Sequence, residues 1–292
     1  MKIESLWLYF QSYFNKNKIM KILIQFLSGK KRFILLFLGA LIFQQTMEAQ
    51  ITVGLDNWFN RETNVKTGKP FHYLWTDTAS SGYSRWGEIF TKNGALISTL
   101  GHQPNVASLS KLDMYIIVDP DTTTESQSPN YIMPNDVKAI EQWVKKGGVL
   151  VLLANDAPNC EFTHLNLLAV RFGIIFNHVS LHPVTNQKWD MGAFTSFPNH
   201  PIFKGVSKIY LKEISSLTLI KPATPILEEN GQVFMGESRV GKGLVLAIGD
   251  PWIYNEYMDH DRLPVDFQNR EAAISLTNYL LLNCRKKGKT IK

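Results

Sequence analysis

Short apolar runs alternate with amphipathic stretches along the chain from residue 51 onward. Three of these runs, Met114–Val118, Val149–Ala154 and Gly243–Ile248, carry almost no polar side chain. A continuous apolar run of this length is typical of a strand that is buried on both faces of a parallel sheet. Weaker runs predict further strands at Ile51–Leu55, Ala95–Leu100 and 173–179, and several shorter strands within 205–235.

The segment Pro134–Lys146 has the spacing of an amphipathic helix. Its apolar residues Val137, Ile140, Trp143 and Val144 fall on one face, Asn135 is the expected N-cap, and Gly147-Gly148 ends it. Similar patterns predict helices at Tyr83–Lys92, at 163–172 and at Arg270–Leu282.

Strands that alternate with helices indicate an α/β fold with an open, mostly parallel sheet flanked by helices. This arrangement is the layering of flavodoxin-like proteins. We find no internal repeat and no low-complexity linker, so we expect one α/β domain over residues 50–284. The polar stretch 56–81 is expected to be a long loop, and Gly241-Lys242-Gly243 a hairpin turn.

Residues 1–49 have the features of a signal peptide. Lys30, Lys31 and Arg32 precede an apolar run at 33–43, which is shorter than the roughly 20 residues that a membrane-spanning helix needs. Cleavage after Ala49 would leave Gln50 first, and Met20 is an alternative start. The alternative is an uncleaved N-terminal anchor. A signal predicts export, and no other stretch is apolar enough to span a membrane, so we expect no stable membrane insertion after cleavage.

Removal of that segment changes the charge. The whole chain has a formal net charge of +6, but the basic residues concentrate in 1–49 and in the tail 285–292, which leaves the body between them slightly acidic. The high pI therefore does not indicate nucleic-acid binding. We interpret the basic tail 285–292 as a solvated end.

The three buried strands each end in an acidic residue: Asp119, Asp156 and Asp250. Ligands of open parallel α/β sheets bind outside the carboxyl ends of the strands. Any one of these aspartates could simply cap a turn, but the three together favour a site.

The segment 249–262 follows the last of these strands and mixes aromatic, amide, carboxylate, His and Arg side chains. Such a mixture suits carbohydrate, because aromatic faces stack on the sugar ring while polar groups bind its hydroxyls. A surface loop with a structural Trp is the alternative interpretation. Further candidate side chains follow the earlier strands at 71–77, 119–131 and 155–164.

Other chemistries are less well supported. The sequence has neither a G-x-S-x-G nucleophile elbow nor a phosphate-binding G-x-x-x-x-G-K-[ST] loop, and no H-E-x-x-H. As metal ligands, His178 and His182 are poorly placed because they lie on a strand-like stretch, and Asp259-His260-Asp261 is only a weak candidate. Cys160 has no flanking glycines and lies past its strand, so it does not fit the nucleophile of a glutaminase. We expect neither a metal nor another cofactor.

Several segments resemble a bacterial domain with a glutamine-amidotransferase-like fold. They include PFHYLW, VDPDT, PNYIM, VKKGGVLVLLAND and GKGLVLAIGDPWIYNEY, and the similarity extends over about residues 51–283. That domain occurs alone, or fused behind unsaturated glucuronyl and rhamnogalacturonyl hydrolases in Bacteroidetes. Among such proteins, the chain is most similar to the oligosaccharide dehydratases of marine ulvan-degrading bacteria.

The resemblance implies a hydro-lyase in the periplasm. It would remove water across C4 and C5 of a glucuronic or iduronic acid at the non-reducing end of an anionic, sulfated oligosaccharide. The product would be an unsaturated uronate, which an unsaturated glucuronyl hydrolase could release. Such an enzyme would act in a pathway with ulvan lyase and sulfatases.

This chemistry needs a base for the C5 proton, an acid for the departing O4, and groups that neutralise the carboxylate. The candidate bases are His72, Lys212 and Tyr254, and the candidate acids are Tyr73, Tyr254 and Glu256. Arg262, Lys212 and Asn255 are expected to hold the carboxylate, and Asp156 and Asp250 to hold hydroxyls or orient a base. The other residues that we expect to contact substrate are Trp75, Asp121, Asn155, Glu161 and Trp252.

Two further functions stay open at this point. The domain could be a non-catalytic carbohydrate-binding or accessory module, because related domains are fused to hydrolases that have their own active sites. It could also be a glycoside hydrolase that uses paired carboxylates, such as Asp250 with Glu256 or Asp156.

Overall fold

The computed structural model describes residues 50–64 and 66–285. The predicted signal peptide 1–49 lies outside the described residues, as does the tail beyond Arg285. Within the described ranges, nine strands form one sheet, and a separate two-stranded antiparallel sheet pairs β6 (Ala193–Phe194) with β7 (Ile209–Tyr210).

Five strands form the parallel part of the sheet, in the order β2-β1-β3-β4-β11. They are β1 (Thr52–Asp56), β2 (Leu96–Leu100), β3 (Met114–Val118), β4 (Val149–Leu153) and β11 (Gly243–Ile248). Every residue of β3, β4 and β11 is buried, as their continuous apolar sequences predict. The open α/β sheet flanked by helices is therefore confirmed.

The other strands extend the sheet in antiparallel fashion beyond β11. They are β5 (Ile174–Phe176), β8 (Leu217–Leu219), β9 (Thr224–Glu229) and β10 (Gln232–Val240). The predicted turn at Gly241-Lys242-Gly243 joins β10 to β11, with Val240 opposite Gly243. Short strands were predicted for 205–235, but β10 is long and continues beyond that range.

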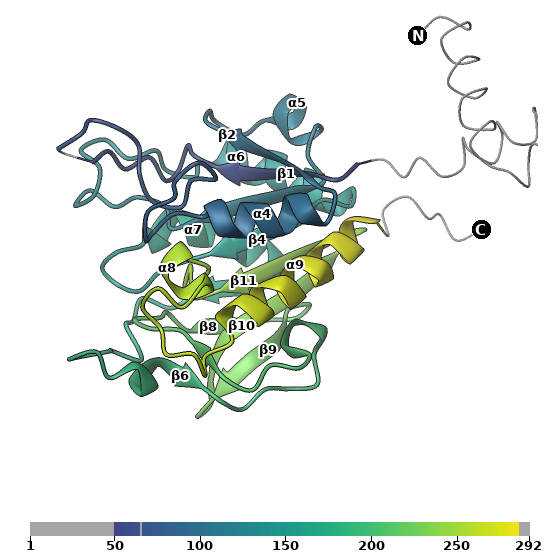
Figure 1. Cartoon of the computed structure of the whole chain (residues 1–292). Helices are drawn as coiled ribbons and strands as arrows, with labels where there is room; N and C mark the ends of the chain where they lie inside the picture. Colours follow the sequence, from purple (N-terminus) through teal and green to yellow (C-terminus); the bar gives the residue numbers. More distant parts are fainter. Residues whose placement is uncertain (1–49, 65, 286–292) are drawn as a thin grey trace, which may run out of the picture. The chain divides into compact units, whose positions relative to one another are not determined.

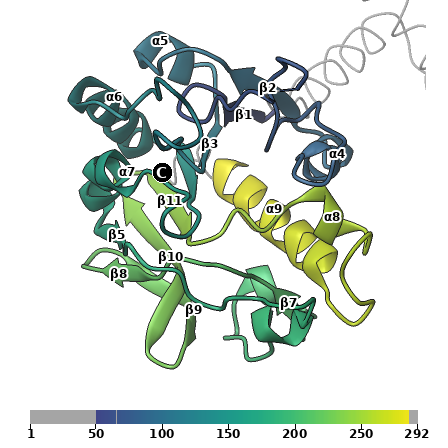
Figure 2. The same ribbon diagram turned by 90° about the vertical axis from the view of Figure 1, so that its left-hand side faces the viewer.

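Helices cover both faces of the sheet (Figures 1 and 2). One face packs against α4 (Ser84–Lys92) and α9 (Asn269–Arg285), which bury Trp86, Phe90 and Leu276. The other face packs against α5 (Val106–Leu109), α6 (Pro134–Lys145) and α7 (Phe162–Ala169). Alternate residues of β3 and β4 point to the two faces, so Ile116 joins one core and Ile117 the other.

Two helix ends differ from the sequence prediction. Met133 occupies the N-cap position of α6, where its N–H donates to the Asp136 carboxylate at 2.9 Å; Pro134 begins the helix. The predicted cap Asn135 was therefore wrong, because a proline is well suited to the first helical position and the cap lies two residues earlier than predicted. The helix predicted at 163–172 ends at Ala169 and continues as the 3₁₀ turn Val170–Phe172.

Candidate functional site

A cavity of about 300 Å³ lies at the carboxyl ends of the parallel strands. We call it the strand-end cavity. It is lined by residues from five separate segments of the chain: Glu62, His72, Tyr73, Ser81, Asp119, Glu125, Asn155, Asn159, Lys212, Glu213, Asp250, Tyr254, Glu256 and Tyr257. It therefore contains all five residues that the sequence suggested for acid–base chemistry, although their individual roles stay predictions.

Asp119 follows β3 directly, and two tyrosine hydroxyls, those of Tyr73 and Tyr254, lead from it toward the cavity. Its Oδ2 accepts a hydrogen bond from the Tyr73 hydroxyl at 2.7 Å and another from Asn155 Nδ2 at 3.0 Å. The Tyr73 hydroxyl in turn lies 3.4 Å from the Tyr254 hydroxyl. Tyr73 and Asp119 are buried, whereas Tyr254 is partly exposed, so Tyr254 is the one of these three residues that is accessible to a bound molecule.

The backbone at this site adopts unusual conformations. His72, Tyr73, Asp119 and Glu213 all have positive φ, between 41° and 65°. Each left-handed non-glycine residue costs on the order of 1–3 kcal/mol, and such residues cluster at functional sites. At Tyr73 the main chain is fixed by an N–H donated to the Ser81 carbonyl at 3.0 Å, which holds the long loop in this conformation.

The carboxyl groups in and beside the cavity are buried close to one another. Burial raises the pKa of Asp119 to about 8, with smaller contributions from Glu125 and Asp121. Burial and the same acidic neighbours raise the pKa of Glu62 to about 8, and burial raises that of Asp121 to about 7. The pKa of Asp250 is also raised by burial. Glu62 and Asp119 are therefore largely protonated at neutral pH, which limits the negative charge of the cavity.

The pKa of His72 is shifted in the opposite direction to those of the carboxyl groups. Burial lowers the pKa of its imidazole below the usual range, so the ring is neutral at pH 7. Its Nε2 is 3.9 Å from Glu62 Oε2, and its Nδ1 is buried without a hydrogen-bond partner among the described residues. A neutral imidazole can accept a proton.

Lys212 is the lysine of the cavity lining, and the end of β11 positions it. Its backbone N–H donates to Asp250 Oδ2 at 2.9 Å, and its Nζ lies 2.8 Å from Glu213 Oε2. The segment is tied to β11 by Ser215, whose N–H donates to the Gly249 carbonyl at 3.0 Å. A Cβ on Gly249 would meet that part of the chain at 1.8 Å, so this close approach requires glycine.

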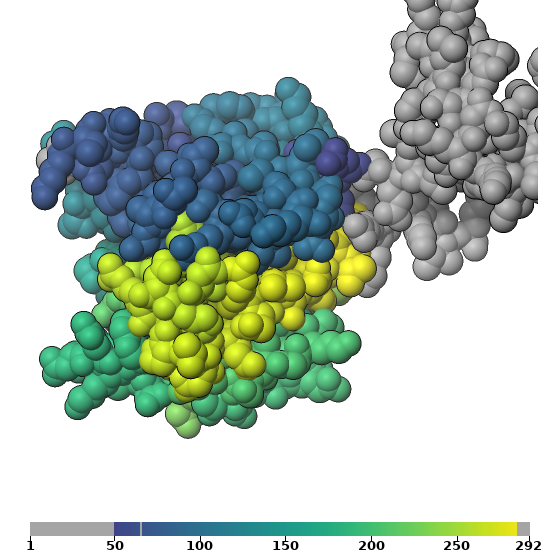
Figure 3. Space-filling view, in the orientation of Figure 1, coloured from purple at the N-terminus to yellow at the C-terminus, as the bar shows by residue number. Residues whose placement is uncertain are grey.

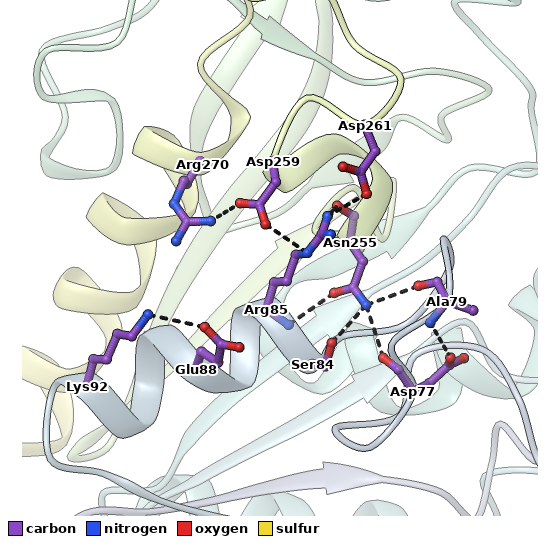
Figure 4. A network of polar contacts seen from close by, with 10 residues as sticks. All are labelled: Asp77, Ala79, Ser84, Arg85, Glu88, Lys92, Asn255, Asp259, Asp261 and Arg270. Atoms are coloured by element: carbon purple, nitrogen blue, oxygen red, sulfur yellow. Dashed lines mark hydrogen bonds and ion pairs between the residues drawn. The ribbon is translucent and has the colours of Figure 1, made fainter.

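Tyr254 precedes the short helix α8 (Asn255–Met258), which Asn255 anchors to the loop before α4 (Figure 4). Asn255 Nδ2 donates to the carbonyls of Asp77 and Ala79, both at 3.0 Å, and its Oδ1 accepts from the Arg85 N–H at 3.0 Å. Both ends of this amide are thus occupied by protein groups. In addition, Arg85 pairs with Asp259 and Asp261 and Arg270 with Asp259 (Figure 4).

Other residues with predicted substrate contacts lie outside the cavity lining. Trp75 and Trp252 are buried in the core, and the Trp75 indole donates to the Ser98 carbonyl at 2.9 Å. Asp121 accepts from the Arg61 N–H, Asp156 from Asn159 Nδ2, and Glu161 caps α7. Arg262 reaches the site indirectly, because its Nε lies 3.0 Å from Glu256 Oε2. Of the predicted contacts, Asn155, Lys212 and Asp250 line the cavity.

Sequence reasoning did not select the lining residues Glu62, Ser81 and Glu213, and it included Glu125, Asn159 and Tyr257 only as members of candidate loops, without a role. It also missed Asp56, which ends β1 and accepts hydrogen bonds from Tyr115 and three backbone N–H groups. The rule that identified Asp119 would have found Asp56, since both follow a strand of the same sheet. Glu62 lies near His72 because the Phe71 N–H donates a hydrogen bond to the Glu62 carbonyl across a turn. The pattern of apolar and polar residues does not reveal this contact.

Among the described residues, no group of three or more His, Cys, Asp or Glu side chains has a geometry that could hold a metal ion. Over the same residues, no helix is long and apolar enough to cross a membrane.

Comparisons with solved structures identify the fold. The mmIFT52 N-terminal domain is 12% identical, with a TM-score of 0.59 over 82% of this chain and 99% of that domain. Two cytoplasmic proteins from Salmonella typhimurium are 16% and 15% identical, with TM-scores of 0.50 and 0.51; each match covers 80% of this chain and nearly all of theirs. No family model matches the chain, and no curated protein matches it either.

The layered α/β fold is shared. Similarity at these identities shows the layered α/β fold alone. What the chain does must be argued from its own cavity.

Proposed function

We propose that the protein is an oligosaccharide dehydratase, which removes water from a uronic acid at the non-reducing end of an oligosaccharide. One observation carries the proposal: His72 and Tyr254 line the same cavity, and their surroundings shift their pKa values in opposite directions. Titratable neighbours whose pKa values are pushed apart are the usual basis of acid and base roles.

His72 is the proposed base. Its imidazole is neutral at pH 7 and can take the C5 proton, which is acidic because C5 is next to the carboxylate. Tyr254 is the proposed acid. Burial raises the pKa of its hydroxyl well above 10, so it keeps its proton until it donates it to the departing O4. The C5–H and C4–O bonds break, a double bond forms between C4 and C5, and water leaves.

Tyr73 and Asp119 would support this proton donation. As Tyr254 gives up its proton, the Tyr73 O–H, which donates to Asp119 in the resting site, would turn to the phenolate 3.4 Å away. Protonated Asp119 would then donate a hydrogen bond to the Tyr73 oxygen. Tyr73 and Asp119 are therefore positioning residues in this proposal.

Lys212 is proposed to bind the substrate carboxylate. Elimination places extra negative charge on that carboxylate, so a cation beside it favours the transition state. Its partner Glu213 is 41% exposed and would exchange places with the substrate carboxylate. Protonated Glu62 would let the cavity accept an anionic sugar by donating a hydrogen bond to it.

The resemblance in PFHYLW and GDPWIYNEY supports the substrate class, an ulvan-type oligosaccharide with a terminal glucuronic or iduronic acid. With residues 1–49 acting as a signal peptide, the enzyme would work in the periplasm on imported oligosaccharides. An unsaturated glucuronyl hydrolase would consume its product.

The test is ultraviolet absorbance of the conjugated uronate after purified protein is added to ulvan oligosaccharides with a saturated terminal uronate. We expect absorbance to rise, with mass spectra showing loss of one water and no change in chain length. Shorter chains without new absorbance would identify a glycoside hydrolase instead. Binding without either change would identify an accessory module.

A further inference from the structure

A second cavity, of about 580 Å³, lies beside the loop that follows α8. We call it the side cavity. It forms where the 3₁₀ turn Trp189–Gly192 and Lys208 meet the segment Pro264–Phe267, on the side of the molecule where the chain after α8 (yellow-green) packs above the segment with β6 (Figure 3).

The lining of the side cavity combines apolar and polar groups. Trp189 is partly exposed, and Met191 and Pro264 extend the apolar surface beside it. Lys208 Nζ lies 4.1 Å from the centre of the Phe267 ring and pairs with Asp190 at 2.8 Å and Asp266 at 2.5 Å. The two carboxylates balance Lys208 and stay 85% and 59% exposed, which leaves them free to accept hydrogen bonds from hydroxyl groups.

Aromatic packing connects the two cavities. The Trp189 ring packs edge-on against Tyr210 at 5.5 Å, and Tyr210 packs edge-on against Tyr257 at 5.0 Å. Tyr257 lines the strand-end cavity. In this row of packed rings the buried ring of Tyr210 lies between Trp189 and Tyr257, a separation that an oligosaccharide longer than a disaccharide can span.

From this arrangement we infer that the side cavity is a subsite for a pyranose ring of the same oligosaccharide, further toward its reducing end. The apolar face of the sugar would stack on Trp189, and its hydroxyls would bind Asp190, Asp266 and Lys208. This inference rests on the proposed function for its choice of ligand.

The test uses ulvan oligosaccharides of increasing length with the W189A variant. We expect W189A to raise KM for tetra- and hexasaccharides about tenfold, with kcat and the disaccharide KM unchanged, because the lost contact is the same in ground and transition states. W58A is the matched control, a partly exposed tryptophan that lines neither cavity. W189F should restore most of the affinity.

Calorimetric affinities of the same oligosaccharides separate this inference from the proposed function. If the wild type binds more tightly as length increases and W189A loses that gain, the subsite stands even when no water is eliminated. If W189A affects all lengths equally, or none, the subsite is wrong. If W189A fails to fold, the D190N/D266N double variant gives the same readout.

Discussion

At the residue scale, the distinguishing feature of the strand-end cavity is a row of two tyrosine hydroxyls, those of Tyr254 and Tyr73, that ends at the buried carboxyl group of Asp119. Tyr254 is its partly exposed member, and the Tyr73 hydroxyl lies between it and Asp119. Because the environment keeps Tyr254 protonated and His72 neutral, the proposed acid and base are in their working states over a wide pH range around neutrality.

Substitution of Tyr254 by Phe should lower kcat by roughly 10²–10⁴-fold, the usual contribution of a positioned proton donor. The fold should stay intact, because the ring packing is kept. Initial rates of absorbance increase give kcat, and Y131F, a partly exposed tyrosine outside the cavity lining, is the control. Unchanged kcat in Y254F would remove Tyr254 from the mechanism.

Substitution of Lys212 by Met should lower kcat by roughly 10²–10³-fold, as expected when one group that stabilises transition-state charge is lost. KM should rise as well, since the same cation binds the ground-state carboxylate. Steady-state kinetics on the shortest substrate measure both, with K111M, at an exposed site outside the cavity lining, as the control. A rise in KM with unchanged kcat would show that Lys212 only binds.

At the scale of elements, the site depends on how closely one segment approaches another. The chain at Lys212–Ser215 crosses the end of β11, where Ser215 hydrogen-bonds to Gly249 and Lys212 to Asp250. A single added carbon at Gly249 would collide with the Ser215 carbonyl.

The G249A variant should therefore lose about 2–4 kcal/mol of stability, since backbone must shift to make room. Chemical denaturation measures this loss. G101A serves as the control, because a Cβ at Gly101 meets nothing within 4 Å and its φ is not positive. Equal stability of the two variants would show that the crossing segment adapts freely.

Much of the fold was predictable from sequence because β3, β4 and β11 are apolar at successive positions. Buried strands of this kind can be identified from their own residues, without knowledge of the strands that they pair with. The strand-end rule likewise located Asp119 and Asp250 in the cavity lining, whereas the third aspartate that it named, Asp156, lies outside the lining and its neighbour Asn155 lines the cavity. The sequence did not reveal that Trp75 and Trp252 are buried, because a tryptophan side chain is as common in a hydrophobic core as in a sugar-binding site. Nor did it reveal Glu62 or the antiparallel order around β10, which depend on contacts between distant segments.

At the scale of the whole molecule, several carboxyl groups are buried near one edge of the sheet. Burial raises the pKa of Asp56 to about 6, of Asp121 to about 7, and of Glu62 and Asp119 to about 8. In the unfolded chain these groups titrate near pH 4. Between pH 4 and 8 the folded state therefore binds more protons than the unfolded state.

Stability should consequently fall as pH rises from 5 to 8 and level off above that. The free energy of unfolding, measured by denaturant titration at each pH, checks this. The D119N variant should reduce the slope by up to about 1.4 kcal/mol per pH unit, which corresponds to one proton. A wild-type stability that increases over this range would contradict the raised pKa values.

The strand-end cavity draws on residues from Glu62 to Tyr257, and two of its proposed working groups, Lys212 and Tyr254, come late in the chain. During synthesis the nascent protein would therefore carry no working site until β11 and α8 had left the ribosome. A chain that crosses a membrane unfolded would stay inert in the compartment where it is made. If residues 1–49 direct export as proposed, the proposed chemistry would begin only after folding on the far side of the membrane, because the cavity is not assembled before then.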